Sequence, residues 1–160
     1  MENALSDRPS AGSDVDHSLP ARVRRILTDD FAPPIARLIG FRLMEVTRGQ
    51  AVFEIDVDPN RHANPMGTLH GGVLCDLADA AMGVAYASTL AEEDTFTTLE
   101  LKINFLRPVW EGRLTATGRL VNGGRSLGLL ECDVVDASGR LVARASSTCM
   151  TLRGDRAEGR

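Results

Sequence analysis

The apolar residues of this chain recur with more than one period, which predicts both strands and helices. Residues 51–57 (AVFEIDV) alternate apolar and polar side chains, as a half-buried strand does. Residues 97–107 (TTLELKINFLR) alternate in the same way, and Pro108 ends the pattern. The apolar side of this second segment carries Leu99, Leu101, Ile103 and Phe105, and the polar side carries Glu100, Lys102 and Asn104. Both segments therefore predict strands with one face toward a core.

Short turn sequences separate the predicted strands. Each of the turns Arg48-Gly49-Gln50, Asn122-Gly123-Gly124 and Ala137-Ser138-Gly139 contains glycine, which suits a tight hairpin. With these boundaries the chain predicts six strands: Phe41–Thr47, Ala51–Val57, Thr97–Arg107, Arg113–Val121, Arg125–Asp136 and Arg140–Leu152.

One segment has the length and composition of a long buried helix. Val73–Leu90 is apolar nearly all round, so we expect other elements to cover most of its faces. One face differs, because Asp76, Asp79 and Gly83 follow each other at three- and four-residue spacing. That face is not ordinary core.

Two shorter helices are predicted before the strands. One spans Ala21–Asp29 and the other Pro34–Ile39, where Pro34 suits a first helical position and Gly40 a stop. The two ends of the chain are polar and suggest no packed structure. We therefore expect a disordered leader at 1–20, one domain at 21–152 and a disordered tail at 153–160.

The order of elements is two strands, one buried helix and four further strands joined by turns. Since nothing else in the chain is large enough, the sheet itself must cover the helix. A curved antiparallel sheet wrapped around one long central helix is an α+β architecture, the hotdog fold.

Composition excludes several classes of protein. The 160 residues carry a formal charge of −4 with no basic run, which argues against nucleic-acid binding. No segment is long enough to span a membrane, and the first twenty residues lack the apolar region of a signal peptide. The three cysteines are scattered and the histidines have no metal spacing with them, so we predict buried reduced thiols, no metal site and a cytoplasmic location.

Candidate chemistry lies where residues 62–72 (HANPMGTLHGG) lead into the long helix. Helix N-termini present unpaired backbone N–H groups that favour negative charge. The Gly71 amide is the candidate donor to an oxyanion, because glycine leaves room for close approach. The alternative is that Gly71 and Gly72 only make the turn into the helix.

Asp79 is the candidate nucleophile or general base. A carboxylate two turns into an apolar helix costs free energy unless it has a role. The alternative is a structural acid paired with a nearby donor. The sequence does not separate nucleophilic attack from activation of water.

The spacing of these two residues predicts a shared site. Asp79 follows Gly71 by eight residues, which is ~12 Å along a helix. The two groups cannot act on one carbonyl from the same chain. We therefore predict a two-fold dimer with antiparallel central helices, in which Gly71 of one subunit faces Asp79 of the other.

Three polar loop residues are weaker candidates. Asn64 either hydrogen-bonds the reacting groups or makes an Asx turn. His70 is a candidate to orient the loop or the substrate carbonyl, and we favour this over a general-base role. His62 is interpreted as a loop residue without a role.

Several motifs together resemble a known family. They are Asn64, Gly67, His70-Gly71-Gly72, Leu77-Ala78-Asp79, residues 99–108 (LELKINFLRP), Gly123-Gly124-Arg125 and residues 139–143 (GRLVA). In this order they resemble the hotdog-fold acyl-CoA thioesterases of the phenylacetate-degradation (PaaI-like) type. Asp76 departs from the pattern, which has a small neutral residue there in many members. Because it is a second acid one turn from Asp79, we expect the pKa of one of these two carboxyl groups to be raised.

The resemblance implies hydrolysis of an acyl-CoA thioester to a free acid and coenzyme A, without a cofactor. It also implies a homo-oligomer, a dimer at least and often a tetramer. The family's water-positioning hydroxyl lies on the strand after the helix, where Thr97 and Thr98 both fit, and Thr98 is our candidate. Gly72, Arg107 and Arg125 are candidates for substrate binding. Arg125 follows the turn that resembles the family's nucleotide-side segment, where a guanidinium suits a phosphate.

Two other functions fit a hotdog fold. A hydratase or dehydratase of 3-hydroxyacyl thioesters usually works with a helix histidine, and this helix has none. A non-catalytic acyl-CoA-binding protein has no need for a buried acid at Asp79. The acyl group itself is not evident, and apolar candidates for its pocket are Met66, Leu69, Met82, Tyr86 and Phe105.

Overall fold

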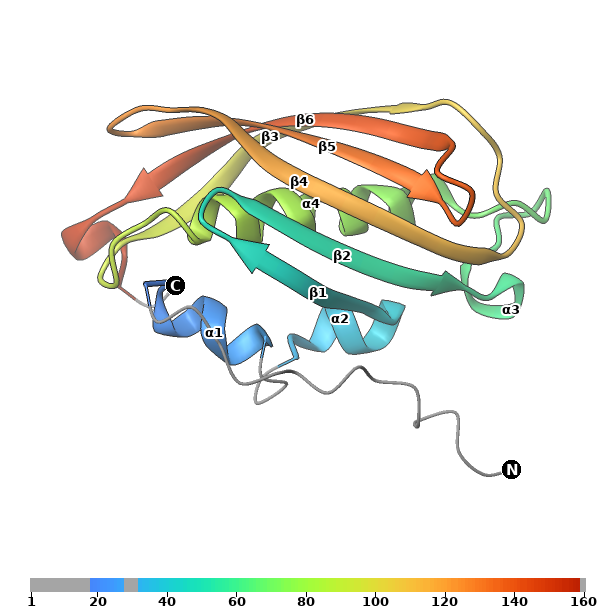
Figure 1. The fold of residues 1–160 in the computed structure, drawn as a ribbon, viewed down its shortest axis with the longest axis horizontal. Helices are drawn as coiled ribbons and strands as arrows, with labels where there is room; N and C mark the ends of the chain where they lie inside the picture. The colour runs from blue at the N-terminus through green and yellow to red at the C-terminus, as the bar shows by residue number, and fades with distance from the viewer. Residues whose placement is uncertain (1–17, 28–31, 159–160) are drawn as a thin grey trace.

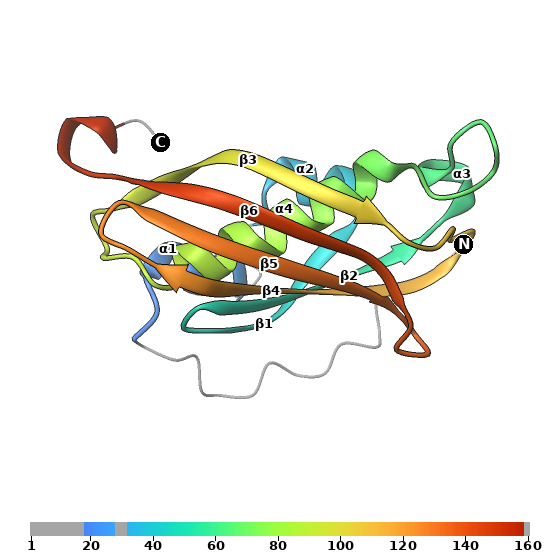
Figure 2. The same cartoon turned by 90° about the horizontal axis from the view of Figure 1, so that it is seen from above.

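Six antiparallel strands form one sheet that curves around a single long helix, as the sequence predicts (Figure 1). The computed structural model describes residues 18–27 and 32–158. The strands lie in the order β1-β2-β4-β5-β6-β3, so β1 and β3 are the two edges (Figure 2). Their bounds are β1 Phe41–Thr47, β2 Gln50–Val57, β3 Thr95–Phe105, β4 Gly112–Gly123, β5 Leu127–Asp136 and β6 Leu141–Leu152.

The long helix α4 spans Gly71–Ala87, so it begins two residues before the predicted helix and ends three residues earlier. Its end is fixed by Ser88, whose hydroxyl donates to the Thr47 and Ala85 carbonyls and accepts from the Gly49 amide in the β1–β2 turn. The predicted helix is too long because no glycine or proline follows Ala87 to mark the end, which Ser88 forms as the C-cap.

The sheet approaches α4 closely at two glycines. A Cβ on Gly118 would lie 2.4 Å from the Ala81 carbonyl carbon, and one on Gly128 would lie 2.3 Å from the Tyr86 ring. Glycine at these positions lets β4 and β5 pack directly against the helix. The core between them contains fully buried Leu77, Ala81 and Met82, among others.

Strand β3 contains a bulge that the sequence pattern does not reveal. Its pairing with β6 shifts between Thr98 and Glu100, and the buried Ser147 hydroxyl donates to the Glu100 carbonyl at 2.8 Å. Because of this shift Leu101 and Ile103 pack against the core, whereas Leu99 lies on the other side and is about half exposed. Phe105 lies on the same side as Ile103, at the end of the strand, and is also about half exposed. The predicted apolar side of this strand is therefore wrong for Leu99 and right for Leu101, Ile103 and Phe105.

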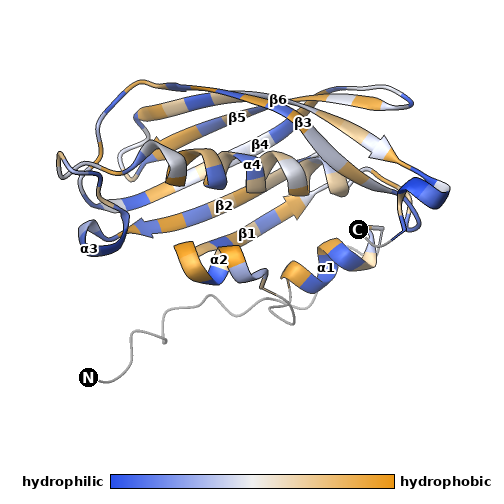
Figure 3. Cartoon of the chain, turned by 180° about the vertical axis from the view of Figure 1, so that it is seen from behind, coloured by the Kyte–Doolittle hydropathy of each residue, from blue (hydrophilic) through white to orange (hydrophobic). Residues whose placement is uncertain are grey.

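Two short helices lie beside β1 along the open side of α4 (Figure 3). Helix α2 spans Pro34–Ile39 as predicted, and Gly40 ends it with a φ of 96° and an N–H that donates to the Ala36 carbonyl. Helix α1 spans Ala21–Leu27; the predicted last two residues lie outside the described part. These helices cover one side of α4 that the strands leave open.

Both chain ends contain structure where we expected disorder. Leu19, within the expected leader, is buried, and Gly154–Arg156 in the expected tail forms a short 3₁₀ helix, η1. Arg153 anchors that end, since its Nε donates to Asp94 at 3.1 Å. Residues 1–17 lie outside the described part of the chain.

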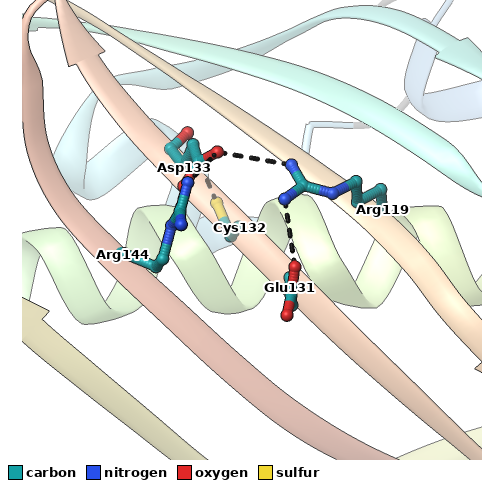
Figure 4. A network of polar contacts seen from close by, with 5 residues as sticks. All are labelled: Arg119, Glu131, Cys132, Asp133 and Arg144. Carbon is teal, nitrogen blue, oxygen red and sulfur yellow. Dashed lines mark hydrogen bonds and ion pairs between the residues drawn. The ribbon is translucent and has the colours of Figure 1, made fainter.

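The convex face of the sheet carries charged side chains that pair across strands (Figure 4). Arg119 on β4 contacts Glu131 and Asp133 on β5, and Arg144 on β6 also donates to Asp133. The Arg144 hydrogen bond is the main cause that lowers the pKa of Asp133. This face is polar, as the alternation along the strands predicts. None of the described helices is both long and apolar enough to cross a membrane.

Candidate active site

The N-terminus of α4 is held by the histidine before it. His70 Nδ1 accepts the Gly72 N–H at 2.9 Å, and the His70 N–H donates to the His62 carbonyl at 2.8 Å. His70 therefore orients the loop, one of the two roles considered for it. The cap occupies the Gly72 amide, whereas the Gly71 amide donates to no acceptor within the described part of the chain. Of the two glycine amides, Gly71 is the one available to a substrate oxygen.

Gly71 is also a site of close packing. A Cβ there would lie 3.0 Å from the Phe105 ring at the end of β3. Any larger residue at this position would press against that ring or displace it. Glycine at this position thus lets the Phe105 ring of β3 pack close to the first turn of α4.

Asn64 forms an Asx turn in the loop before α4. Its Oδ1 accepts the Met66 N–H at 2.9 Å and the Thr68 N–H at 3.3 Å, and its Nδ2 donates to Thr68 Oγ1. These contacts establish the structural role of Asn64, and its contact with substrate stays a prediction. His62 ends a short helix, α3 (Pro59–His62), that the sequence analysis missed. The His62 ring is buried between the Asp58 amide and the Ile39 carbonyl.

Asp79 lies on the open face of α4 and pairs with the strand beside it. The Thr98 hydroxyl donates to Asp79 Oδ1 at 3.1 Å and lies 3.9 Å from the buried Cys149 sulfur. The bulge after Thr98 allows this residue and Leu101 to face the same side of β3. We expected Asp79 to be buried at a cost in free energy, but within the single chain its side chain is exposed.

Asp76 stands one turn before Asp79 on the same face. Burial raises the pKa of Asp76, and the nearby charge of Asp79 adds to the rise. Burial likewise raises the pKa of Cys75, and it raises that of Cys132 to about 12, so neither thiol is activated as a thiolate. All three cysteines are free; Cys132 and Cys149 are buried as predicted, and Cys75 is partly exposed.

A cavity of about 490 Å³ runs along this face of α4, between the helix and the two N-terminal helices. We call it the α4 cavity. Asp76, Asp79 and Gly83 all line it, which confirms that they share one face. The candidates for an apolar pocket named from the sequence are wrong for this cavity. Leu69, Met82 and Tyr86 belong to the core, Met66 is exposed, and Phe105 lies outside this cavity, beside Gly71.

The two candidate arginines lie at opposite ends of the sheet. Arg125 lines a second, polar pocket at the C-terminal end of α4, together with Arg48 and Arg153. Arg107 follows the other end of β3, where its backbone pairs with Val142. Within one chain the structure does not bring Arg107 and Arg125 together. Arg48 and Arg153 were not predicted, because neither follows a recognisable motif.

Comparison with known proteins agrees with this architecture. The pattern of the thioesterase superfamily matches residues 66–143, which include Gly71, Asp79 and Thr98. A putative esterase of Saccharolobus solfataricus is 32% identical over 122 residues, 76% of this chain and 86% of that protein. The 1,4-dihydroxy-2-naphthoyl-CoA hydrolase of Listeria monocytogenes is 30% identical over 110 residues, 69% of this chain and 89% of that enzyme.

Among solved structures, the PaaI protein of the Escherichia coli phenylacetic acid degradation operon superposes with a TM-score of 0.75. The two share 25% identity, over 85% of this chain and 97% of that one. The fold and the elements around α4 define a hotdog-fold thioester hydrolase. The chain belongs to the thioesterase superfamily.

Proposed function

We propose that this enzyme hydrolyses an acyl-CoA thioester to a free acid and coenzyme A. The observation that carries the proposal is Asp79, hydrogen-bonded to Thr98 in the wall of the α4 cavity. Asp79 either attacks the carbonyl carbon or takes a proton from the attacking water. Thr98 uses its proton on Asp79, so its oxygen can accept a hydrogen bond from that water.

The Gly71 amide is the proposed donor to the carbonyl oxygen. Negative charge develops on that oxygen as the thioester is attacked. When the C–S bond breaks and the thiolate leaves, the oxygen becomes part of a carbonyl group again. The α4 dipole adds to the effect of the N–H group. The capping of Gly72 by His70 supports Gly71 as the donor.

We propose that two subunits complete each site. Gly71 and Asp79 lie on one continuous helix, ~12 Å apart along its axis. The edge strand β3 has no partner on one side among the described residues, and exposed apolar side chains lie on it or follow it: Leu99, Phe105, Leu106 and Trp110. A second copy paired antiparallel at this edge would bring Gly71 of one subunit toward Asp79 of the other. Such dimers pair into the tetramer that the family resemblance implies.

The same dimer suits a substrate with phosphates. Antiparallel pairing of β3 would place Arg107 of one subunit near the end of the partner that carries Arg125. Guanidinium groups there would bind the phosphates of coenzyme A. Free thiols also suit the reducing cytoplasm in which we place the enzyme.

The direct test of this function is hydrolysis of acyl-CoA by the full chain and by Asp79→Asn. Release of free thiol should fall at least ~10²-fold in kcat for the variant, because the carboxylate is the base or nucleophile. Thermal unfolding of both proteins checks that the variant is folded. Equal kcat in a folded Asp79→Asn protein would overturn the role of Asp79, and no release of free thiol by the wild-type enzyme would overturn the proposed hydrolysis.

A further inference from the structure

The α4 cavity continues well past Asp79 along the helix. Its α4 lining begins with Asp76 and Asp79 and continues through Ala80, Gly83, Val84 and Ala87. These positions repeat at three and four residues, so they form one stripe on one face. From Asp79 to Ala87 the stripe is ~12 Å long. If the reacting carbonyl lies at Asp79, the acyl chain attached to it can extend along the helix toward Ala87.

The walls beyond Asp79 are apolar. Val23 and Ile26 of α1 and Ile35 of α2 face the helix across the cavity, and Phe53 and Phe96 close it from the sheet. Phe96 comes close because Gly83 has no side chain, since a Cβ there would lie 3.2 Å from the ring. These walls offer dispersion contacts rather than hydrogen bonds to a ligand.

The charged side chains that line the cavity do not offer hydrogen bonds to a ligand at the end far from Asp79. Arg22 donates to the Ala91 and Glu92 carbonyls at 3.0 and 3.2 Å. Its Nε has no acceptor among the described residues but is shielded from solvent, so a bound chain cannot reach it. Arg42 is paired with Asp56 on β2. The two carboxylates, Asp76 and Asp79, both stand at the opposite end.

From this geometry we infer that the α4 cavity binds an unbranched, medium-chain acyl group of about ten carbons. The inference rests on the proposed function, because it places the thioester carbonyl at Asp79. An extended chain advances ~1.3 Å per carbon, from its bond lengths, so ~12 Å holds about nine carbons beyond the carbonyl. The volume of about 490 Å³ lies in the range of small-molecule sites. Acyl groups that carry hydroxyl or carboxyl groups at the far end would lose hydrogen bonds there.

The test is a panel of straight-chain acyl-CoA substrates from two to sixteen carbons, with benzoyl-CoA added. The value of kcat/KM should rise about three- to fourfold for each CH₂ that enters the apolar walls, and should be highest near eight to ten carbons. A flat profile, or benzoyl-CoA hydrolysed faster than decanoyl-CoA, would overturn the inference.

Two variants at the far end should move the optimum in opposite directions. Ala87→Met fills the end of the cavity, so the ratio of kcat/KM for decanoyl-CoA to that for butyryl-CoA should fall at least tenfold. Ile26→Ala lengthens the cavity from α1, so the optimum should move to longer chains even if the first variant folds poorly. Ala137→Met, in the exposed β5–β6 turn, is the matched control and should leave the ratio unchanged.

The outcomes separate this inference from the proposed function. If wild-type enzyme hydrolyses acyl-CoA and needs Asp79, but both variants keep its chain-length optimum, the inference alone is wrong. If wild-type enzyme hydrolyses no acyl-CoA on the panel, the proposed function fails; if Asp79→Asn retains full activity, the role of Asp79 fails, and the inference that places the carbonyl there fails with it.

Discussion

The residues that carry the proposed chemistry differ in how far the sequence reveals them. Gly71 and Asp79 stand out because glycine at a helix mouth and a carboxylate in an apolar helix are both unusual. Thr97 and Thr98 do not separate in the sequence, because the bulge after Thr98 leaves no signal in it. For Asn64 the sequence does not separate contact with substrate from an Asx turn, because an Asx turn depends on the path of the loop that follows.

Thr98 offers a prediction with a built-in control. Thr98→Val keeps the shape of the side chain but removes the hydrogen bond to Asp79. We expect kcat to fall roughly tenfold, because that change in rate corresponds to the free energy of about one hydrogen bond to a charged group. Thr97→Val, at the neighbouring position, should stay close to wild type, because among the described residues Thr98, and not Thr97, donates to Asp79. Steady-state kinetics on one acyl-CoA would measure both, and equal losses in the two variants would contradict the role of Thr98.

Asp76 should make stability depend on pH. Its pKa is raised in the folded protein, so the protonated form is favoured by folding. Its contribution to stability is fully present below the unfolded pKa of about 3.9 and is lost as pH rises through the folded value. Asp76→Asn, which stays neutral, should therefore have a higher Tm than wild type at pH 7.

The measurement is the difference in Tm between Asp76→Asn and wild type, followed from pH 7 down to pH 4. Other carboxylates titrate in both proteins and cancel in the difference. The advantage of the variant should shrink as wild-type Asp76 takes up its proton. A difference that stays constant with pH would contradict a raised pKa at this residue.

At the scale of elements, periodicity identified every strand and the long helix. Periodicity did not reveal the bulge in β3 or the short helix α3. The β3 bulge depends on a hydrogen bond from Ser147, which lies 47 residues away in the chain, and no local pattern records it. The short helix α3 was missed because four residues give no period, although Asp58 caps it.

The contact between β4 and α4 gives a prediction at this scale. Gly118→Ala would place a Cβ against the helix backbone at Ala81, which cannot move aside as a flexible side chain would. The free energy of unfolding should fall by about 1–3 kcal/mol or more, the usual cost of overpacking. Gly124→Ala, whose Cβ would meet only the Leu127 carbonyl at 3.4 Å, should change it by less than about 0.5 kcal/mol. Urea unfolding measures both; a mild effect at Gly118 would show that the helix and sheet can separate.

At the scale of the whole molecule, the sequence predicted the sheet around the helix but not the lining of the α4 cavity. The hydrophobic pattern of the strands and of α4 is strong, because each buries one face along its length. The cavity depends on α1 and α2, and where such short helices pack is set by tertiary contacts rather than by their own sequence. The apolar residues chosen for the pocket were consequently core or surface residues.

The two faces of the sheet also differ in what they can bind. The convex face carries the paired charges of Arg119, Asp133 and Arg144, as is typical of a surface that faces solvent. The exposed apolar side chains lie instead on β3 and just beyond it, at the edge where the second subunit is proposed.

Mixed dimers test the shared site most directly. Gly71→Val blocks the amide in one chain, and Asp79→Asn removes the acid in another; each protein alone should be nearly inactive. After the two are unfolded together and refolded at equal amounts, half of the dimers are mixed, and each mixed dimer has one intact site. The account predicts recovery of about a quarter of wild-type activity, from one site in half of the dimers. No recovery, with dimers shown to exchange subunits, would contradict a site in which one subunit supplies the amide and the other the carboxylate.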